Sequence, residues 1–133
     1  ESEVTLGETL SDVATDFQVI SKLRPDVSPC QVLDQVDGSL KRLNQRSIYG
    51  FLTHRFEDFK RQEIRDQMKK AKERNLIQKI GVSLYEPEEV TWLLENEVQF
   101  DLIQFPYSIF DQRFSGVMQK LKAHDVEIHV RSV

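Results

Sequence analysis

Four polar residues stand at the ends of apolar runs in this 133-residue chain. Lys22 comes near the end of "FQVISKL", His54 ends "SIYGFLTH", Ser83 ends "IQKIGVS", and Gln104 lies in "FDLIQF". An ammonium beside an imidazole can lower the pKa of a nearby hydroxyl and polarise a carbonyl oxygen. Serine and glutamine add neutral donors and acceptors that can orient an amide. These residue types predict carbonyl chemistry, provided that the fold brings them together.

Each of these residues also has a plain structural explanation. A lysine at a strand end can extend its ammonium into solvent, and a histidine there can bridge a loop. Serine and glutamine are common at strand ends. Further along the chain, Tyr107, Arg131 and Ser132 extend the polar set, and the flat guanidinium of Arg131 can stack on a ring. The case for a site therefore depends on the elements that carry these side chains.

Short β-rich runs alternate along the chain with longer stretches of helical period. We expect strands at residues 17–23, 47–54, 77–83, 100–107 and 126–133. We expect helices at 2–13, 28–44 and 58–75, then one that starts at Pro87 and one marked by Phe114, Val117, Met118 and Leu121. No hairpin signal separates the strands, so the pattern predicts an α/β fold with a parallel sheet and right-handed crossovers.

Two parallel architectures fit this alternation. An open dinucleotide-binding sheet carries a glycine-rich turn after its first strand, and none of the five glycines forms one. A barrel gathers functional side chains at the carboxyl ends of its strands, which is where the polar residues fall. A complete (β/α)8 barrel of the TIM type takes about 200 to 250 residues. Residues 1–133 are therefore interpreted as one incomplete barrel domain of about five β/α units.

Composition narrows the classes of partner. The formal net charge of −4 does not favour nucleic acid or an anionic membrane, which both attract a basic face. No run approaches the roughly 20 apolar residues of a membrane span. Cys30 is the sole cysteine, which suits a reducing compartment, and we expect it to be buried and inert in the first turn of a helix. The histidines, with this one cysteine, show no metal-ligand spacing, so no metal site is expected.

The chain resembles the aldo-keto reductase superfamily over essentially its whole length. "SEVTLGETL" resembles the helix that follows the family's catalytic tyrosine, and "IQKIGVSLYEPEEVTWLLEN" resembles its "IGVS" strand with a proline-led helix. "FDLIQFPYSIFDQR" is similar to the sixth-strand region, and "VEIHVRSV" to the seventh strand of a bacterial branch. Each motif is weak by itself, but their ordered succession is specific. It aligns the chain with roughly strands three to seven of eight.

The resemblance implies an oxidoreductase that reduces aldehydes or ketones with NADPH in the cytoplasm. It assigns Lys22 and His54 to the catalytic tetrad, and Ser83, Gln104 and Arg131 to the nicotinamide site. The tetrad's aspartate and tyrosine, with tyrosine as general acid, would come before Glu1. We therefore expect a carbonyl compound as substrate of the parent enzyme, but no useful turnover, and doubtful NADPH binding, by these 133 residues. Exposed sheet edges would favour self-association.

The alternative from the same resemblance is a regulatory or binding subunit that keeps the fold without turnover. The presence of both Lys22 and His54 favours an enzyme, since a binding module needs neither. Leu84 stands where the family commonly has asparagine, which would remove one contact to the nicotinamide amide.

Overall fold

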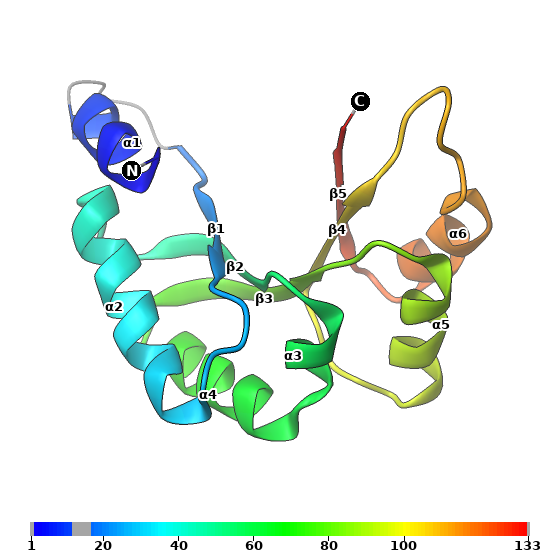
Figure 1. Cartoon of the computed structure of the whole chain (residues 1–133), viewed down its shortest axis with the longest axis horizontal. Coiled ribbons are helices and arrows are strands. Elements are labelled where there is room, and N and C mark those ends of the chain that lie inside the picture. Colours follow the sequence, from blue (N-terminus) through cyan, green and yellow to red (C-terminus); the bar gives the residue numbers. More distant parts are fainter. Residues whose placement is uncertain (1, 12–16, 133) are drawn as a thin grey trace.

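The computed structural model describes residues 2–11 and 17–132, and its centre is a five-stranded parallel sheet (Figure 1). The strands are β1 (Ile20–Leu23), β2 (Ile48–Thr53), β3 (Ile77–Ser83), β4 (Leu102–Pro106) and β5 (Glu127–Arg131). They lie side by side in the order in which they occur in the chain. This is the order of consecutive β/α units in a barrel, so the predicted fold class is confirmed as an incomplete barrel.

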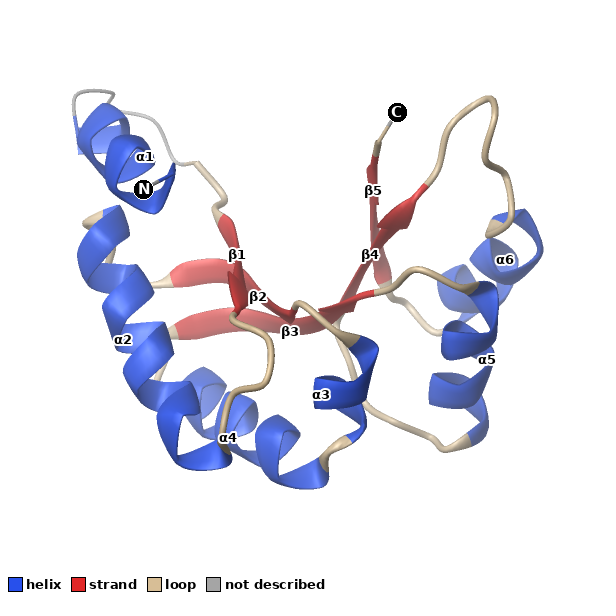
Figure 2. Ribbon diagram, viewed as in Figure 1, coloured by secondary structure: helices blue, strands red, loops and turns tan. Residues whose placement is uncertain are grey.

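Helices follow the strands as the alternation predicted. They are α1 (Ser2–Ser11), α2 (Val32–Leu43), α3 (Phe56–Lys60), α4 (Gln62–Glu73), α5 (Pro87–Glu95) and α6 (Ser115–Ala123). The sheet bends into a trough, with α2 to α6 along its convex outer side and α1 beside α2 at one rim (Figure 2). None of the described helices lies on the concave side (Figure 2), as the inside of a barrel requires.

The core fills the layer between the convex face and the helices. Leu23, Phe51 and Val82 point into this layer from the strands and are almost completely buried. From the helices it receives Val36, Leu43, Phe59, Ile64, Met68, Val90, Leu93 and Leu121. Phe105 of β4 and Phe114 before α6 stack with their ring centroids 4.2 Å apart. The apolar stripes predicted for the helices therefore pack against the convex face of the sheet.

Close packing on the concave side requires a glycine at position 81. A Cβ on Gly81 would lie 2.2 Å from the Leu102 carbonyl oxygen and 2.5 Å from a Leu52 methyl group. Only glycine lets β3 approach its neighbours this closely. Since side chains alternate between the two faces of a strand, Ser83 shares the concave face with Gly81. By the same rule Lys22 and Ile20 project to the same face of β1. A Cβ on Gly50 of β2 would touch Ile20, which places both residues on the concave face.

The helix predicted over 58–75 is two helices. It starts earlier, at Phe56, and breaks at Arg61, whose backbone is extended (φ −74°, ψ 116°). The Arg61 guanidinium donates to the Val27 carbonyl 3.0 Å away, which ties the break to the loop after β1. Arg65 donates to the Phe59 and Lys60 carbonyls at the end of α3. These side-chain bonds replace the backbone bonds that a continuous helix would have made.

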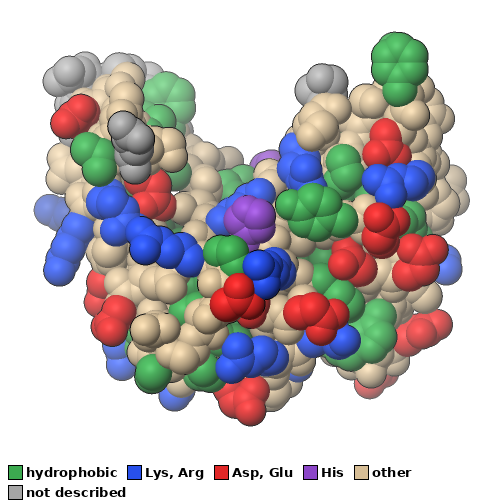
Figure 3. Space-filling model, viewed as in Figure 1, with side chains coloured by type: hydrophobic (Ala, Val, Ile, Leu, Met, Phe, Trp, Pro, Cys, Tyr) green, Lys and Arg blue, Asp and Glu red, His purple; other side chains and the backbone are tan. Residues whose placement is uncertain are grey.

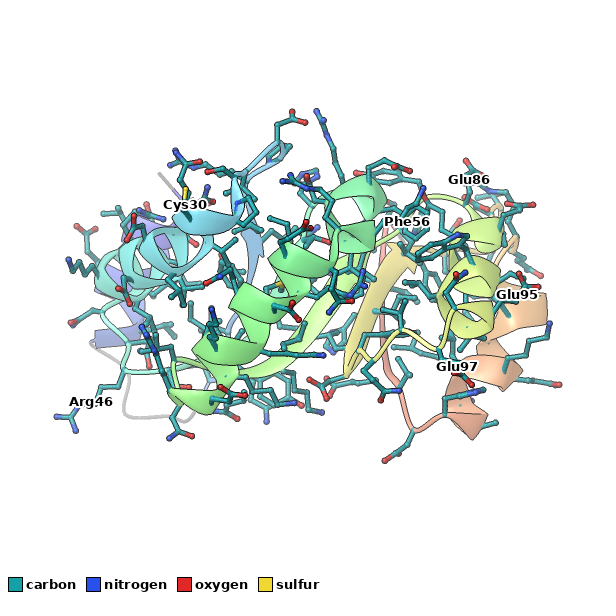
Figure 4. The ribbon with its side chains drawn as sticks, turned by 90° about the horizontal axis from the view of Figure 1, so that it is seen from below. Cys30, Arg46, Phe56, Glu86, Glu95 and Glu97 are labelled. Carbon is teal, nitrogen blue, oxygen red and sulfur yellow. The ribbon has the colours of Figure 1, made fainter. Side chains whose placement is uncertain are left out.

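The expected burial of Cys30 was wrong. The predicted helix over 28–44 begins as a short 3₁₀ turn (Pro29–Gln31), and this turn leaves the thiol exposed beside Ser28, with Sγ and Oγ 3.2 Å apart (Figure 4). Ser28 and Gln31 still form the predicted capping box, because the Gln31 side chain accepts the Ser28 N–H at 3.3 Å.

Several predicted elements differ from the observed ones in their bounds. The strands expected over 17–23 and 126–133 are shorter, since their outer residues make no sheet pairs among those described. Part of the helix expected over 2–13 falls outside the described residues. Asn75, expected to end the third helix, lies just beyond α4 with a left-handed φ of 59°. Within the described residues, no helix is long and apolar enough to cross a membrane.

Candidate active site at the carboxyl edge

The five predicted site residues all lie toward the carboxyl edge of the sheet. Lys22 is the second-last residue of β1, His54 directly follows β2, Ser83 ends β3, and Arg131 ends β5. Gln104 lies within β4, paired in register with Ser83. Because all strands run parallel, these positions share one edge of the trough. Figure 3 shows Lys, Arg and His side chains gathered in the hollow between its two arms.

Lys22 and Ser83 meet across an intervening strand. The Lys22 ammonium donates to the Ser83 hydroxyl oxygen at 3.4 Å, although β2 separates their strands. Ser83 is completely buried and Lys22 is half-buried. Burial lowers the pKa of the Lys22 ammonium, and the positive charge of Arg131 lowers it further. The sheet therefore holds a lysine that gives up its proton more readily than a lysine in water.

Arg131 faces this lysine from the opposite arm of the trough. Its guanidinium carbon lies 4.4 Å from the centre of the Tyr85 ring, which is cation–π geometry. One guanidinium nitrogen, Nη2, donates to the Leu84 carbonyl at 3.4 Å. A second nitrogen, Nε, is buried and has no hydrogen-bond partner among the described residues. Arg131 therefore already stacks on a ring of this chain, that of Tyr85. Sequence reasoning did not single out this tyrosine.

His54 and Gln104 lie at the same edge without joining this cluster. The His54 imidazole is exposed, and its side chain makes no hydrogen bond to any described residue. The Gln104 backbone carbonyl accepts the Leu84 N–H at 2.7 Å, while its side chain is half-buried. The structure therefore brings together Lys22, Ser83 and Arg131, and leaves the other two predicted residues open to a ligand.

A second polar cluster lies lower on the concave face. Glu127 of β5 forms an ion pair with Lys79 of β3 and accepts a hydrogen bond from the Tyr49 hydroxyl of β2 at 2.6 Å. His129 Nε2 lies 2.5 Å from the other carboxylate oxygen. These bonds, Lys79 first, hold the pKa of Glu127 at about 2 and raise that of Lys79. The cluster links three of the five strands across the trough.

The sequence contained a signal for this cluster that went unused. Glu127, His129 and Arg131 alternate along β5, so all three project to the same face. Lys79 stands at the same spacing before Gly81 on β3. Polar residues at every second position indicate a wet inner face, which strand ends alone do not reveal. Among the described residues, no group of three or more His, Cys, Asp and Glu lies close enough to hold a metal ion.

Comparison with known protein families shows to which family the chain belongs. The model of the Aldo/keto reductase family matches residues 1–133. The chain belongs to this family. No curated protein matches the chain.

Solved aldo-keto reductases share its fold. An aldo-keto reductase from Pseudomonas aeruginosa is 24% identical with a TM-score of 0.85, and the match covers 98% of this chain and 55% of that one. AKR11C1 from Bacillus halodurans, in its holo form, is 24% identical with a TM-score of 0.83, over 97% and 45%. AKR2E4 from Bombyx mori, in complex with NADP, is 19% identical with a TM-score of 0.79, over 98% and 48%. The chain spans about half the length of the solved structures it matches.

Proposed function

We propose that this aldo-keto reductase domain contributes the lysine, the histidine and part of the cofactor site of an NADPH-dependent carbonyl reductase. The observation that carries the proposal is the half-buried ammonium of Lys22, held by the buried Ser83 hydroxyl and facing Arg131. Family membership and the NADP complex of the silkworm relative support the same chemistry. The substrate class is an aldehyde or ketone, and the product is the alcohol.

The polar groups at this edge fit a nicotinamide. The Ser83 hydroxyl accepts from Lys22 and keeps its own proton to donate, and the Gln104 side-chain amide is unpaired among the described residues. Buried Nε of Arg131 has no partner among them, so a polar ligand atom would satisfy it. When bound, the dihydronicotinamide supplies hydride to the carbonyl carbon. The Leu84 side chain is apolar and has no hydrogen bond to offer the amide, while its carbonyl accepts a bond from Arg131.

Lys22 and His54 have distinct roles in this proposal. A nearby ammonium stabilises the anion of a neighbouring phenol, so Lys22 would lower the pKa of a tyrosine that acts as general acid. His54 is exposed at the same edge, where its imidazole N–H can donate to the substrate oxygen and orient it. By resemblance, neither the tyrosine nor the aspartate of the tetrad has a counterpart in these 133 residues. We therefore propose that the 133-residue chain lacks turnover.

An assay of NADPH oxidation with aldehydes tests both parts. The 133-residue chain should show no rate above buffer, whereas the family-length protein that contains it should turn over. In that longer protein, Lys22→Met should lower kcat by about a hundredfold or more, the range of a lost acid–base contribution. Lys120→Met removes an exposed lysine of α6 and serves as the control. Equal activity of the two variants would refute the role of Lys22.

The same experiment addresses the alternative of a regulatory or binding subunit. The exposed His54, without a hydrogen bond to the described residues, is the observation that leaves this alternative open. NADPH binding by the family-length protein without reduction of any aldehyde or ketone would favour it. Measurable turnover that His54→Gln reduces would exclude it.

We further propose a cytoplasmic protein whose exposed sheet edges support self-association. In the described sheet, β1 and β5 each pair on one side only, and unpaired strand edges offer main-chain groups to another strand. Sedimentation of the 133-residue chain over a range of concentrations tests this. A mass that stays monomeric at the highest concentration would contradict the proposal.

A further inference from the structure

The contact between Arg131 and Tyr85 is unusual because it joins two elements that no backbone ladder connects. Tyr85 lies in the turn between β3 and α5, whereas Arg131 ends β5, two strands away. The tyrosine is 44% exposed, so burial of its ring does not explain why it covers the guanidinium. The 4.4 Å approach is instead set by attraction between a cation and the face of the ring.

The turn that carries Tyr85 is held firmly on both sides. Before it, Leu84 is fully buried, and its N–H donates to the Gln104 carbonyl. After it, one carboxylate oxygen of Glu89 accepts the N–H of Tyr85 at 2.8 Å and that of Glu86 at 3.0 Å. The ring is therefore anchored at the start of α5 before any ligand arrives, and it can hold a flexible side chain against it.

Arg131 needs such a support because it faces a like charge. Lys22 lies close enough for the two positive charges to interact, and repulsion would turn the long arginine side chain away from the lysine. An arginine side chain also loses considerable rotamer freedom when it is fixed. The Tyr85 ring and the Leu84 carbonyl oppose both effects, one through the face of the guanidinium and the other through Nη2.

We propose that Tyr85 is a positioning residue that holds the Arg131 guanidinium opposite Lys22, with one planar face on the phenol ring and the other face left for a flat heteroaromatic ring. That the second ring is the nicotinamide rests on the proposed function. The positioning itself does not, because it concerns only groups of this chain.

The Lys22 pKa reports the position of Arg131 without any cofactor. Lysines of the 133-residue chain are labelled by reductive ¹³C-methylation, the Lys22 signal is assigned with Lys22→Arg, and its pKa is measured by NMR titration. Tyr85→Ala should raise this pKa toward its usual value, because the guanidinium moves away. Arg131→Met should raise it as well, and the double variant should show no further increase. Tyr85→Phe keeps the aromatic face and should leave the pKa low.

Two results would overturn the positioning. The first is a Lys22 pKa that Tyr85→Ala leaves unchanged. The second is a rise in the Tyr85→Ala variant that persists in full when Arg131→Met is already present. Phe110→Ala is the matched control, since Phe110 is an aromatic residue with 94% exposure, and this variant should leave the pKa unchanged. Thermal unfolding of each variant separates local loosening from loss of the fold.

A second measurement tests the identity of the ring in the family-length protein. Tyr85→Ala should weaken NADPH binding by about three- to thirtyfold, the range of a cation–π contact, while Tyr85→Phe should bind as the parent does. Unchanged binding in Tyr85→Ala would overturn the second half of the proposal. If the unaltered protein bound no NADPH while the Lys22 pKa responded as expected, the proposed function would fail and the positioning would stand.

Discussion

Replacing the Glu127 carboxylate tests whether the polar cluster on the concave face stabilises the fold. Its oxygens receive bonds from three side chains on three strands, so Glu127→Gln loses the ion pair to Lys79 and weakens the bonds from Tyr49 and His129. The substitution keeps the size and shape of the side chain. Any loss of stability therefore reports charge and hydrogen bonding, not packing.

The magnitude follows from the pKa of Glu127. A fall from 4.5 to about 2 corresponds to an upper bound of about 3 kcal/mol. The Glu127 and Lys79 side chains keep 27% and 34% of their exposure, so water screens part of this interaction. We expect Glu127→Gln to lower the free energy of unfolding by about 1–2 kcal/mol at pH 7.

The pH dependence has a definite sign. The pKa of Glu127 is lower in the folded chain than in the unfolded chain, so its stabilisation is complete above pH 4.5. It is lost as the pH falls from 4.5 through about 2, where the folded carboxylate takes up its proton. The difference between parent and Glu127→Gln should therefore shrink steadily over that window. Urea unfolding followed by circular dichroism at a series of pH values measures it.

A matched control separates this effect from general charge removal. Glu95 is an exposed carboxylate in the last turn of α5, at the outer rim in Figure 4. Glu95→Gln should leave stability unchanged or raise it by a few tenths of a kcal/mol, because a negative charge there opposes the helix dipole. Equal effects of the two substitutions at pH 7, or a difference that does not depend on pH between 4.5 and 2, would refute the reasoning.

Other expected outcomes concern backbone packing and capping. Gly81→Ala should lower the free energy of unfolding by about 2–3 kcal/mol, because its Cβ would collide with the Leu102 carbonyl oxygen. Gly116→Ala, in α6 with no atom within 4 Å of the added Cβ, should raise it by about 0.5–1 kcal/mol. A similar loss in both would contradict the close approach of β3 and β4. Glu89→Ala should cost about 1 kcal/mol through loss of the bonds to the Tyr85 and Glu86 N–H groups, and urea midpoints close to the parent value would show that this cap is dispensable.

Most of the fold could be predicted because its signals are local. Apolar runs such as Ile48–Leu52 became strands, and Pro87 with Glu89 began a helix, since both features depend on residues a few positions apart. The break at Arg61 could not be predicted in this way. It depends on the Val27 carbonyl, which lies in another loop, and no pattern within the helix itself indicates that bond.

The candidate site shows the same limit. Strand ends placed Lys22, Ser83 and Arg131 at one edge; in the structure Lys22 bonds to Ser83, and the charge of Arg131 acts on Lys22. Sequence reasoning missed Tyr85, because its partner lies 46 positions further along the chain and neither residue ends a motif that includes the other. Contacts across a curved sheet depend on how strongly it bends, and this curvature is set by packing far from either residue.

The arrangement of strands in chain order has a consequence for how the molecule acquires its shape. Every strand docks beside the one that was synthesised just before it, so each new β/α unit finds a finished surface and needs no partner from a distant part of the chain. Such nearest-neighbour pairing keeps each loop closure within one β/α unit, which limits its entropic cost. The β/α units of a growing polypeptide can therefore join the sheet one after another, in the order of their synthesis.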